Sequence, residues 1–95
     1  GADVLYAPGI STPEQISAVV AAAGAKPVNL LVGGRTPLSL QDIAALGVRR
    51  VSLGGALARA AWGGLMQAIE PILQDGRFDG LQQAASGAAL NALFR

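Results

Sequence analysis

The sequence predicts an α/β fold in which three short strands alternate with three helices. Short apolar runs recur along the chain, and each run is followed by a turn that contains glycine. Each turn then leads into a segment whose apolar residues have helical spacing. Strands that alternate with helices form parallel sheets with right-handed crossovers, because each helix carries the chain back to the start of the next strand.

The first cycle begins with the run ADVLYAPG, which is typical of a buried strand and the turn that ends it. The helix that follows has a clear N-terminus, because Thr12 with Gln15 three positions later forms a capping box. Pro13 suits the first helical position, where its missing N–H has no cost. Gly24 supplies the signal that ends this helix.

The second cycle joins the run KPVNLLVGG, predicted to be a strand, to a short helix that Ser39 and Asp42 cap and Gly47 ends. The third cycle joins VRRVSLGG to a long helical segment that ends near Asp75. Pro71 lies inside this segment. Because proline lacks the N–H donor, we expect the helix to kink or break there.

We therefore divide the chain into a βαβαβα segment, residues 1–77, and a C-terminal helical tail, residues 78–95. Three parallel strands cannot close a barrel, and an eight-stranded barrel takes about 250 residues. The first segment has the content of the last three βα units of a (β/α)8 TIM barrel, so the predicted fold class is a partial TIM barrel followed by C-terminal helices. The tail has these apolar anchors: Phe78, Leu81, Leu90, Leu93 and Phe94.

The composition indicates that these 95 residues do not make a self-sufficient domain. Hydrophobic residues make up 52% of the chain and charged residues only 14%, whereas an average soluble domain has roughly 25% charged residues. A small domain should be more polar than average, because it buries a smaller fraction of its surface. We expect the excess apolar surface to be covered by a partner chain or by a missing piece of the same domain.

Charge and residue types exclude several classes of function. The net charge of +1 gives no electrostatic footprint for nucleic acid. The absence of cysteine and histidine removes disulfides, thiolate chemistry, the usual zinc sites and His-based triads from these residues. The apolar stretches are interrupted too often to span a bilayer, so we expect no membrane role. A cytoplasmic location is compatible with these features and is our expectation.

Three blocks together resemble the C-terminal third of the isocitrate lyase and phosphoenolpyruvate mutase superfamily: GADVLYAPGISTPEQISAVV, KPVN with LLVGG, and LSLQDIAALGVRRVSLGGALARAAWGGLMQA. The resemblance implies a (β/α)8 barrel to which this chain contributes strands six, seven and eight. It also implies Mg²⁺ and a small 2-oxo or 2-hydroxy carboxylate substrate, with a C–C or P–C bond made or broken beside it. The metal-binding carboxylates would lie on earlier strands, outside this segment.

The resemblance also implies partners. Members of the superfamily exchange their final helices between subunits, so the tail could pack on or swap with a neighbouring subunit of a homo-oligomer. Otherwise the partner would be the other part of the barrel.

The sequence departs from the motifs of the lyase branch that cleaves methylisocitrate. Pro8 stands where that branch has a glutamate at the end of strand six. Leu31, Gly33 and Gly34 stand where strand seven would carry an asparagine, a threonine and a glutamate. These residues cannot make the same polar contacts, which argues against cleavage of methylisocitrate or isocitrate. The resemblance therefore implies a fold and a substrate class but no catalytic residue in this chain.

Candidate substrate-binding residues follow the predicted strands, because barrel enzymes carry their chemistry at the C-terminal strand ends. They are Gly9, Gly33, Gly34, Arg35, Gly54 and Gly55. Gly54 and Gly55 could let backbone N–H groups at a helix start approach a carboxylate, or could simply permit a tight turn, which is the more common role. Arg35 could hold a carboxylate with two parallel hydrogen bonds, or could be an exposed loop arginine. Asn29 lies mid-strand, and if buried its amide must be satisfied. A structural hydrogen bond would be the more common way, and a contact with substrate is the alternative.

The sequence leaves three hypotheses about function open. The chain could be part of a Mg²⁺-dependent lyase or phosphonomutase-like enzyme that is inactive without the earlier strands. It could be a non-catalytic structural or interaction fragment that oligomerises through open sheet edges. A free-standing small-ligand binder is the weakest of the three, because a three-stranded sheet offers half a pocket.

Overall fold

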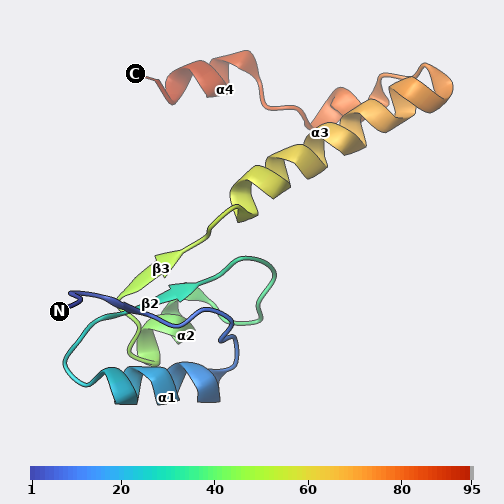
Figure 1. The fold of residues 1–95 in the computed structure, drawn as a ribbon. Coiled ribbons are helices and arrows are strands. Elements are labelled where there is room, and N and C mark those ends of the chain that lie inside the picture. The colour runs from blue at the N-terminus through green and yellow to red at the C-terminus, as the bar shows by residue number, and fades with distance from the viewer. Residues whose placement is uncertain (95) are drawn as a thin grey trace. The chain divides into compact units, whose positions relative to one another are not determined.

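The computed structural model describes residues 1–94, which form two compact units, Gly1–Ala58 and the residues from Arg59 onward. The first unit contains the strands and the first two helices (Figure 1). The elements in chain order are β1 (Leu5–Tyr6), α1 (Pro13–Ala23), β2 (Val28–Leu31), α2 (Leu40–Ala45), β3 (Arg50–Ser52), α3 (Ala56–Asp75), the 3-10 helix η1 (Asp79–Gln83) and α4 (Gly87–Ala92). The predicted alternation of three strands with three helices is confirmed.

The three strands form one parallel sheet in the order β1-β2-β3. Asn29 on the central strand lies between Tyr6 on β1 and Arg50 on β3, and Leu31 lies beside Ser52. Helices α1 and α2 both lie against the same face of this sheet (Figure 1). The order and direction of the strands are those of consecutive βα units in a barrel.

The core of the first unit lies between the sheet and these two helices. Ile16 of α1, Leu30 of β2 and Ile43 of α2 are buried against one another, with Val48 completing the cluster. Side chains alternate between the two faces of a strand, so Leu30 and its neighbour Val28 mark the helix-covered face. Leu5 and Val51 are in register with these two residues and share their face. The opposite face carries the other five strand side chains: Tyr6, Asn29, Leu31, Arg50 and Ser52.

Both predicted capping boxes are present. In α1 the backbone N–H of Gln15 donates to Thr12 Oγ1 at 3.3 Å, and the Gln15 side chain accepts from the Thr12 N–H at 3.2 Å. In α2 the N–H of Asp42 donates to Ser39 Oγ at 3.1 Å, and the Asp42 carboxylate accepts from the Ser39 N–H at 2.8 Å. Gly24 ends α1 with a positive φ of 61°, as its predicted role requires.

The long helix α3 runs through Pro71 without a break and ends at Asp75. Proline at this position leaves the carbonyl of Gln67 without its helical donor. That carbonyl lies beside Gly80 of η1, where a built Cβ would be 3.2 Å from the Gln67 oxygen and 2.9 Å from Ala68 Cα. The close approach of Gly80 packs η1 against α3 at the turn that the proline weakens.

The predicted tail contains two short helical elements, η1 and α4, and its apolar anchors are exposed within the described residues. No residue of α3, η1 or α4 is buried. Trp62 and Met66 of α3 are 64% and 67% exposed. Within residues 1–94 no helix has the length and apolar character needed to cross a bilayer.

Replacing Gly47 by alanine should destabilise the first unit by about 2–4 kcal/mol. Gly47 has a φ of 94°, which costs an L-residue about 1–2 kcal/mol. An added Cβ would also lie 2.8 Å from Cγ1 of Val20, a stiff β-branched side chain. Gly9→Ala is the matched control, because Gly9 has a similar φ of 87° and no atom lies within 4 Å of the added Cβ. Urea denaturation should show the larger loss for Gly47→Ala, and equal losses would contradict the predicted clash.

Replacing Ser39 by alanine should raise the pKa of Asp42. The hydrogen bonds from the Ser39 hydroxyl and backbone N–H hold the pKa of the Asp42 carboxyl below its ordinary value. A pKa that is lower in the folded state adds stability above the unfolded-state pKa, and this stability is lost as the pH falls through the folded-state pKa. An NMR titration of the Asp42 carboxyl in the wild type and in Ser39→Ala should show the upward shift in the variant. An unchanged midpoint would show that the hydroxyl does not stabilise the carboxylate.

Candidate functional site

The candidate site lies at the edge of the sheet where the three parallel strands end. β1 is followed by Gly9, β2 by the loop that starts with Gly33, and β3 by Gly54. Because the strands are parallel, their carboxyl ends meet at the same edge. The structure therefore places all three glycine-containing turns on the side that carries chemistry in barrel enzymes.

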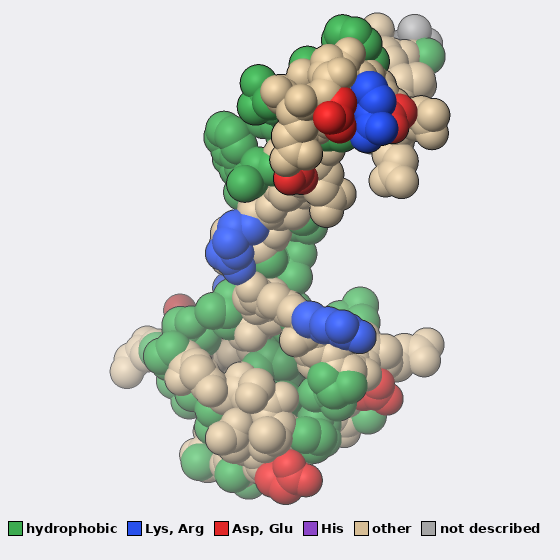
Figure 2. Space-filling model, turned by 90° about the vertical axis from the view of Figure 1, so that its right-hand side faces the viewer, with side chains coloured by type: hydrophobic (Ala, Val, Ile, Leu, Met, Phe, Trp, Pro, Cys, Tyr) green, Lys and Arg blue, Asp and Glu red, His purple; other side chains and the backbone are tan. Residues whose placement is uncertain are grey.

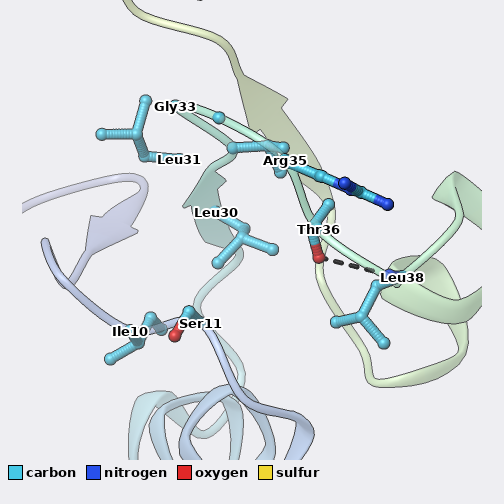
Figure 3. A pocket seen from close by; sticks show the side chains of 10 residues that line it. Ile10, Ser11, Leu30, Leu31, Gly33, Arg35, Thr36 and Leu38 are labelled. Atoms are coloured by element: carbon cyan, nitrogen blue, oxygen red, sulfur yellow. Dashed lines mark hydrogen bonds between the residues drawn. The ribbon is translucent and has the colours of Figure 1, made fainter.

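A small cavity of about 130 Å³ opens at the end of β2 (Figure 3). Three predicted site residues, Gly33, Gly34 and Arg35, line it together with Ile10 and Ser11 from the segment after β1. A cavity of this size has room for about four water molecules. It suits a small polar ligand rather than a large one.

The polar groups of this cavity come from two loops. Thr36 also lines it, and its hydroxyl oxygen accepts a hydrogen bond from the Leu38 N–H at 3.2 Å, which fixes the loop after Arg35. On the other side, the Ser11 N–H donates to the Gln15 side chain at 3.0 Å. This bond uses the backbone of Ser11 and leaves its hydroxyl for other partners. The cavity is thus a pocket with apolar walls and a few hydroxyl and backbone groups.

Arg35 is exposed and forms no hydrogen bond or ion pair with the residues that the structure describes. In Figure 3 its guanidinium extends toward the side of the loop that carries Thr36 and Leu38, away from Ile10 and Ser11. Its charge is therefore available at the rim of the cavity rather than on its floor. A guanidinium in this position can meet a carboxylate that enters from outside.

The turn between β3 and α3 requires glycine at position 54. Gly54 has a φ of 54°, and a built Cβ would lie 3.3 Å from Cδ1 of Leu31. Gly55 follows in the same turn, and α3 begins at Ala56 with no acidic residue in its first turn. The turn geometry alone accounts for Gly54. The helix start nevertheless presents backbone N–H groups at the chemical edge of the sheet.

The structure brings together only part of the predicted set. Gly33, Gly34 and Arg35 share the cavity, whereas Gly9, Gly54 and Gly55 lie in the neighbouring turns and are not among its described lining residues. Sequence reasoning missed Ile10, Ser11 and Thr36. The signal for them was their position, because each follows directly after a residue or turn already selected at a strand end.

Asn29 lies on the face of the sheet opposite the helices and is only 4% exposed. Its Nδ2 donates to Ser52 Oγ at 2.9 Å, and its Oδ1 accepts from Nη1 of Arg50 at 3.2 Å. The expected structural hydrogen bond of a buried mid-strand amide is confirmed. The sequence did not identify its partners, because cross-strand pairing depends on the register of the sheet.

The described residues do not fit a Mg²⁺ site. Within residues 1–94, no group of three Asp, Glu, His or Cys side chains lies close enough to hold a metal ion. A protein Mg²⁺ site relies on carboxylates and other oxygen ligands in near-octahedral geometry. These residues therefore support no step that runs through a metal.

The family of the chain follows from comparison with known proteins. A family model described as phosphoenolpyruvate phosphomutase matches residues 1–73. The chain belongs to this family. This confirms the superfamily that the sequence resembles and the α/β class of fold, a small parallel sheet with helices that matches part of a TIM barrel.

Solved structures of the superfamily support the same fold. A protein of Burkholderia cenocepacia J2315, provisionally described as a lyase/mutase, is 50% identical with a TM-score of 0.88 over 99% of this chain. A 2,3-dimethylmalate lyase and an oxaloacetate acetylhydrolase with bound oxalate match with TM-scores of 0.74 and 0.73 at 22% and 23% identity, over 98% and 96% of this chain. These two matches show the fold alone. No protein of curated function matches the chain significantly.

The chain spans about a third of the length of the solved structures that it matches, 34% of the Burkholderia protein, 34% of the lyase and 32% of the acetylhydrolase. The described residues therefore correspond to one part of a larger superfamily barrel.

Proposed function

We propose that this chain forms the last three βα units of a barrel enzyme that acts on a small 2-oxo or 2-hydroxy carboxylate. The reaction would make, break or rearrange a C–C or P–C bond next to the carboxylate. The observation that carries the proposal is the family match over residues 1–73. A cavity at the strand ends, where barrel enzymes carry their chemistry, supports it. The small volume of the cavity is consistent with a small acid.

In this proposal the chain contributes to binding rather than to bond cleavage. Arg35 at the rim of the cavity would hold the substrate carboxylate, because a guanidinium matches the geometry of a carboxylate with two N–H groups. The turn Gly54–Gly55 and the start of α3 would add backbone N–H groups and the positive end of a helix dipole. Gly9, Gly33 and Gly34 would let substrate come close to the backbone of the strand ends.

The catalytic groups and the Mg²⁺ ion would belong to strands outside these residues. The described residues supply no carboxylate cluster at the cavity, so the chain alone would be inactive. A bound Mg²⁺ would polarise the oxygens of the substrate next to the bond that changes. The replacement of lyase motif residues by Pro8, Leu31, Gly33 and Gly34 points to a substrate other than methylisocitrate or isocitrate.

A second candidate function is a non-catalytic interaction module. The sheet has unpaired edges at β1 and β3 within the first unit, and such edges readily pair with another chain. Hydrophobic side chains also remain on the surface of the helical residues from Arg59 onward (Figure 2). Trp62, Met66, Ile69 and Leu73 follow one side of α3 at helical spacing and are all exposed. A neighbouring subunit of a homo-oligomer would cover this stripe in either proposal.

The first experiment compares two preparations. The barrel assembled from these residues and the strands that complete it should turn over at least one member of a panel of 2-oxo and 2-hydroxy carboxylates and phosphonopyruvate, when Mg²⁺ is present. The 95-residue chain alone should show no turnover and should elute from a size-exclusion column as an oligomer. If the assembled barrel folds and acts on no member of the panel, the enzymatic proposal is wrong and the interaction module is favoured.

Replacing Arg35 by alanine in the assembled barrel should raise KM by about 10–100-fold, since loss of a charge-assisted hydrogen bond costs about 1.5–3 kcal/mol. The value of kcat should change less, because the group would bind the unreactive carboxylate in both ground and transition state. Arg49→Ala is the matched control, because Arg49 is an exposed arginine directly before β3 and does not line the cavity. Steady-state kinetics measure both variants, and unchanged kinetics for Arg35→Ala would make Arg35 a surface residue.

A further inference from the structure

The face of the sheet opposite the helices carries a fixed polar cluster. Both polar ends of the Asn29 amide bond to β3, because Oδ1 accepts from the Arg50 guanidinium at 3.2 Å and Nδ2 donates to Ser52 Oγ at 2.9 Å. Asn29 is buried at 4% exposure, Ser52 is half-buried and Arg50 is exposed. The amide therefore sets the position of a guanidinium whose outer side remains accessible within the first unit.

The cluster presents mainly hydrogen-bond donors to any group that approaches this face of the sheet. A guanidinium has five N–H donors and no acceptor, and the bond to Asn29 uses one of its two Nη groups. Because Ser52 Oγ accepts from Asn29, its own O–H remains free to donate. Tyr6, the neighbour of Asn29 on β1, adds a phenolic O–H. A surface of this kind is complementary to a group that carries acceptors and negative charge.

The first unit supplies no counter-charge for Arg50. Its acidic residues are Asp3, which precedes β1, Glu14 in the first turn of α1, and Asp42, whose carboxylate accepts from Ser39. None of them forms an ion pair with Arg50 within the part of the chain that the structure describes. On the strands themselves Tyr6 is the only other titratable side chain among the described residues.

Closure of a barrel would change the surroundings of Arg50. The helices of a (β/α)8 barrel lie outside, so the face with Asn29, Arg50 and Ser52 becomes the interior. An arginine enclosed in an interior is strongly unfavourable unless a carboxylate pairs with it. About two thirds of the Burkholderia protein, which is 50% identical over this region, lies outside the part that this chain matches. Strands in that part are the available source of a carboxylate.

We infer that the Arg50, Asn29 and Ser52 cluster receives an aspartate or glutamate side chain from a barrel strand outside these residues, as an interior salt bridge. Arg50 is the first residue of β3, whereas the candidate cavity lies beyond the strand ends. The carboxylate is therefore a protein group and not the substrate. The salt bridge joins the last three βα units to the rest of the barrel and fixes their register. The inference rests on the barrel of the proposed function.

The test uses Arg50→Met in the assembled barrel, with Arg49→Met as the matched control. Arg50→Met keeps the length of the side chain but leaves the partner carboxylate buried without its cation. We expect the midpoint of thermal unfolding at about pH 8 to fall by roughly 5–10 °C, because breaking a buried pair strands a charge. Arg49→Met should leave it within about 2 °C, since Arg49 is exposed and changes at surface sites are small.

The pH dependence separates a salt bridge from simple packing. In the wild type the partner carboxylate has a pKa lowered by Arg50, so its contribution to stability is present at neutral pH. In Arg50→Met the stranded carboxylate has a raised pKa, so its penalty is relieved as the pH falls through that value. The difference between the variant and the wild type should therefore shrink by at least half between about pH 8 and about pH 5. A difference that does not change with pH would overturn the inference.

Two further results complete the test. If Arg50→Met does not fold at either pH, the test uses Arg50→Lys, because a lysine keeps the positive charge. An unfolding midpoint within about 4 °C of the wild type supports the salt bridge. Failure to fold, or a loss of about 10 °C or more, overturns it. Size exclusion and circular dichroism of the wild type come first. If the wild type forms no folded α/β assembly, the barrel of the proposed function fails, whereas a folded barrel without the pH effect contradicts only the salt bridge.

Discussion

The structure depends on one constraint. A parallel sheet must be covered on both faces, and the backbone N–H and C=O groups at its outer strands must find hydrogen-bond partners. The first unit meets this requirement on one side only. α1 and α2 bury Val28 and Leu30 of the central strand, and a single cluster around Ile16 and Ile43 holds this layer together. The other face carries polar and half-buried side chains, and both outer strands have a free edge within this unit. A closed barrel satisfies both demands at once, because closure removes edges and encloses the inner face.

The structure confirms the sequence motifs whose interactions join residues only a few positions apart. The two capping boxes, Thr12 with Gln15 and Ser39 with Asp42, form as written because each needs only residues three positions apart. Gly47 shows a longer-range reason for a glycine, since its backbone passes so close to Val20 that a Cβ would not fit. The helix starts and the helix ends are thus fixed independently of the sheet. Such agreement between local and global preferences is what makes the βαβ order readable from sequence.

Most of the fold could be predicted from the sequence, and the parts that could not share a cause. Strand order and parallel direction follow from the alternation of strands and helices, but the neighbours of Asn29 depend on a register that no local pattern encodes. Ile10, Ser11 and Thr36 follow directly after selected residues, but their sharing of one cavity depends on the approach of two loops. Pro71 is a different case. Proline chemistry predicted a kink or a break, and the helix does not break there: α3 continues through Pro71, and Gly80 packs against the weakened turn.

Polar side chains occupy two separate places on this sheet, one at the strand ends and one on the face opposite the helices. At the strand ends, Arg35 and the glycine turns form a rim with charge and accessible backbone but no carboxylate. Lower on the inner face, Arg50 is oriented by Asn29 and has an open side. An enzyme that binds an anion gains from a cation at the mouth, yet a second cation inside the barrel would compete for the same anion if it stayed unpaired. Pairing Arg50 with a protein carboxylate would remove this competition and leave the mouth free for the small acid that we propose as substrate. The same pairing explains why a chain with so little charge retains an arginine on the face that closure would bury.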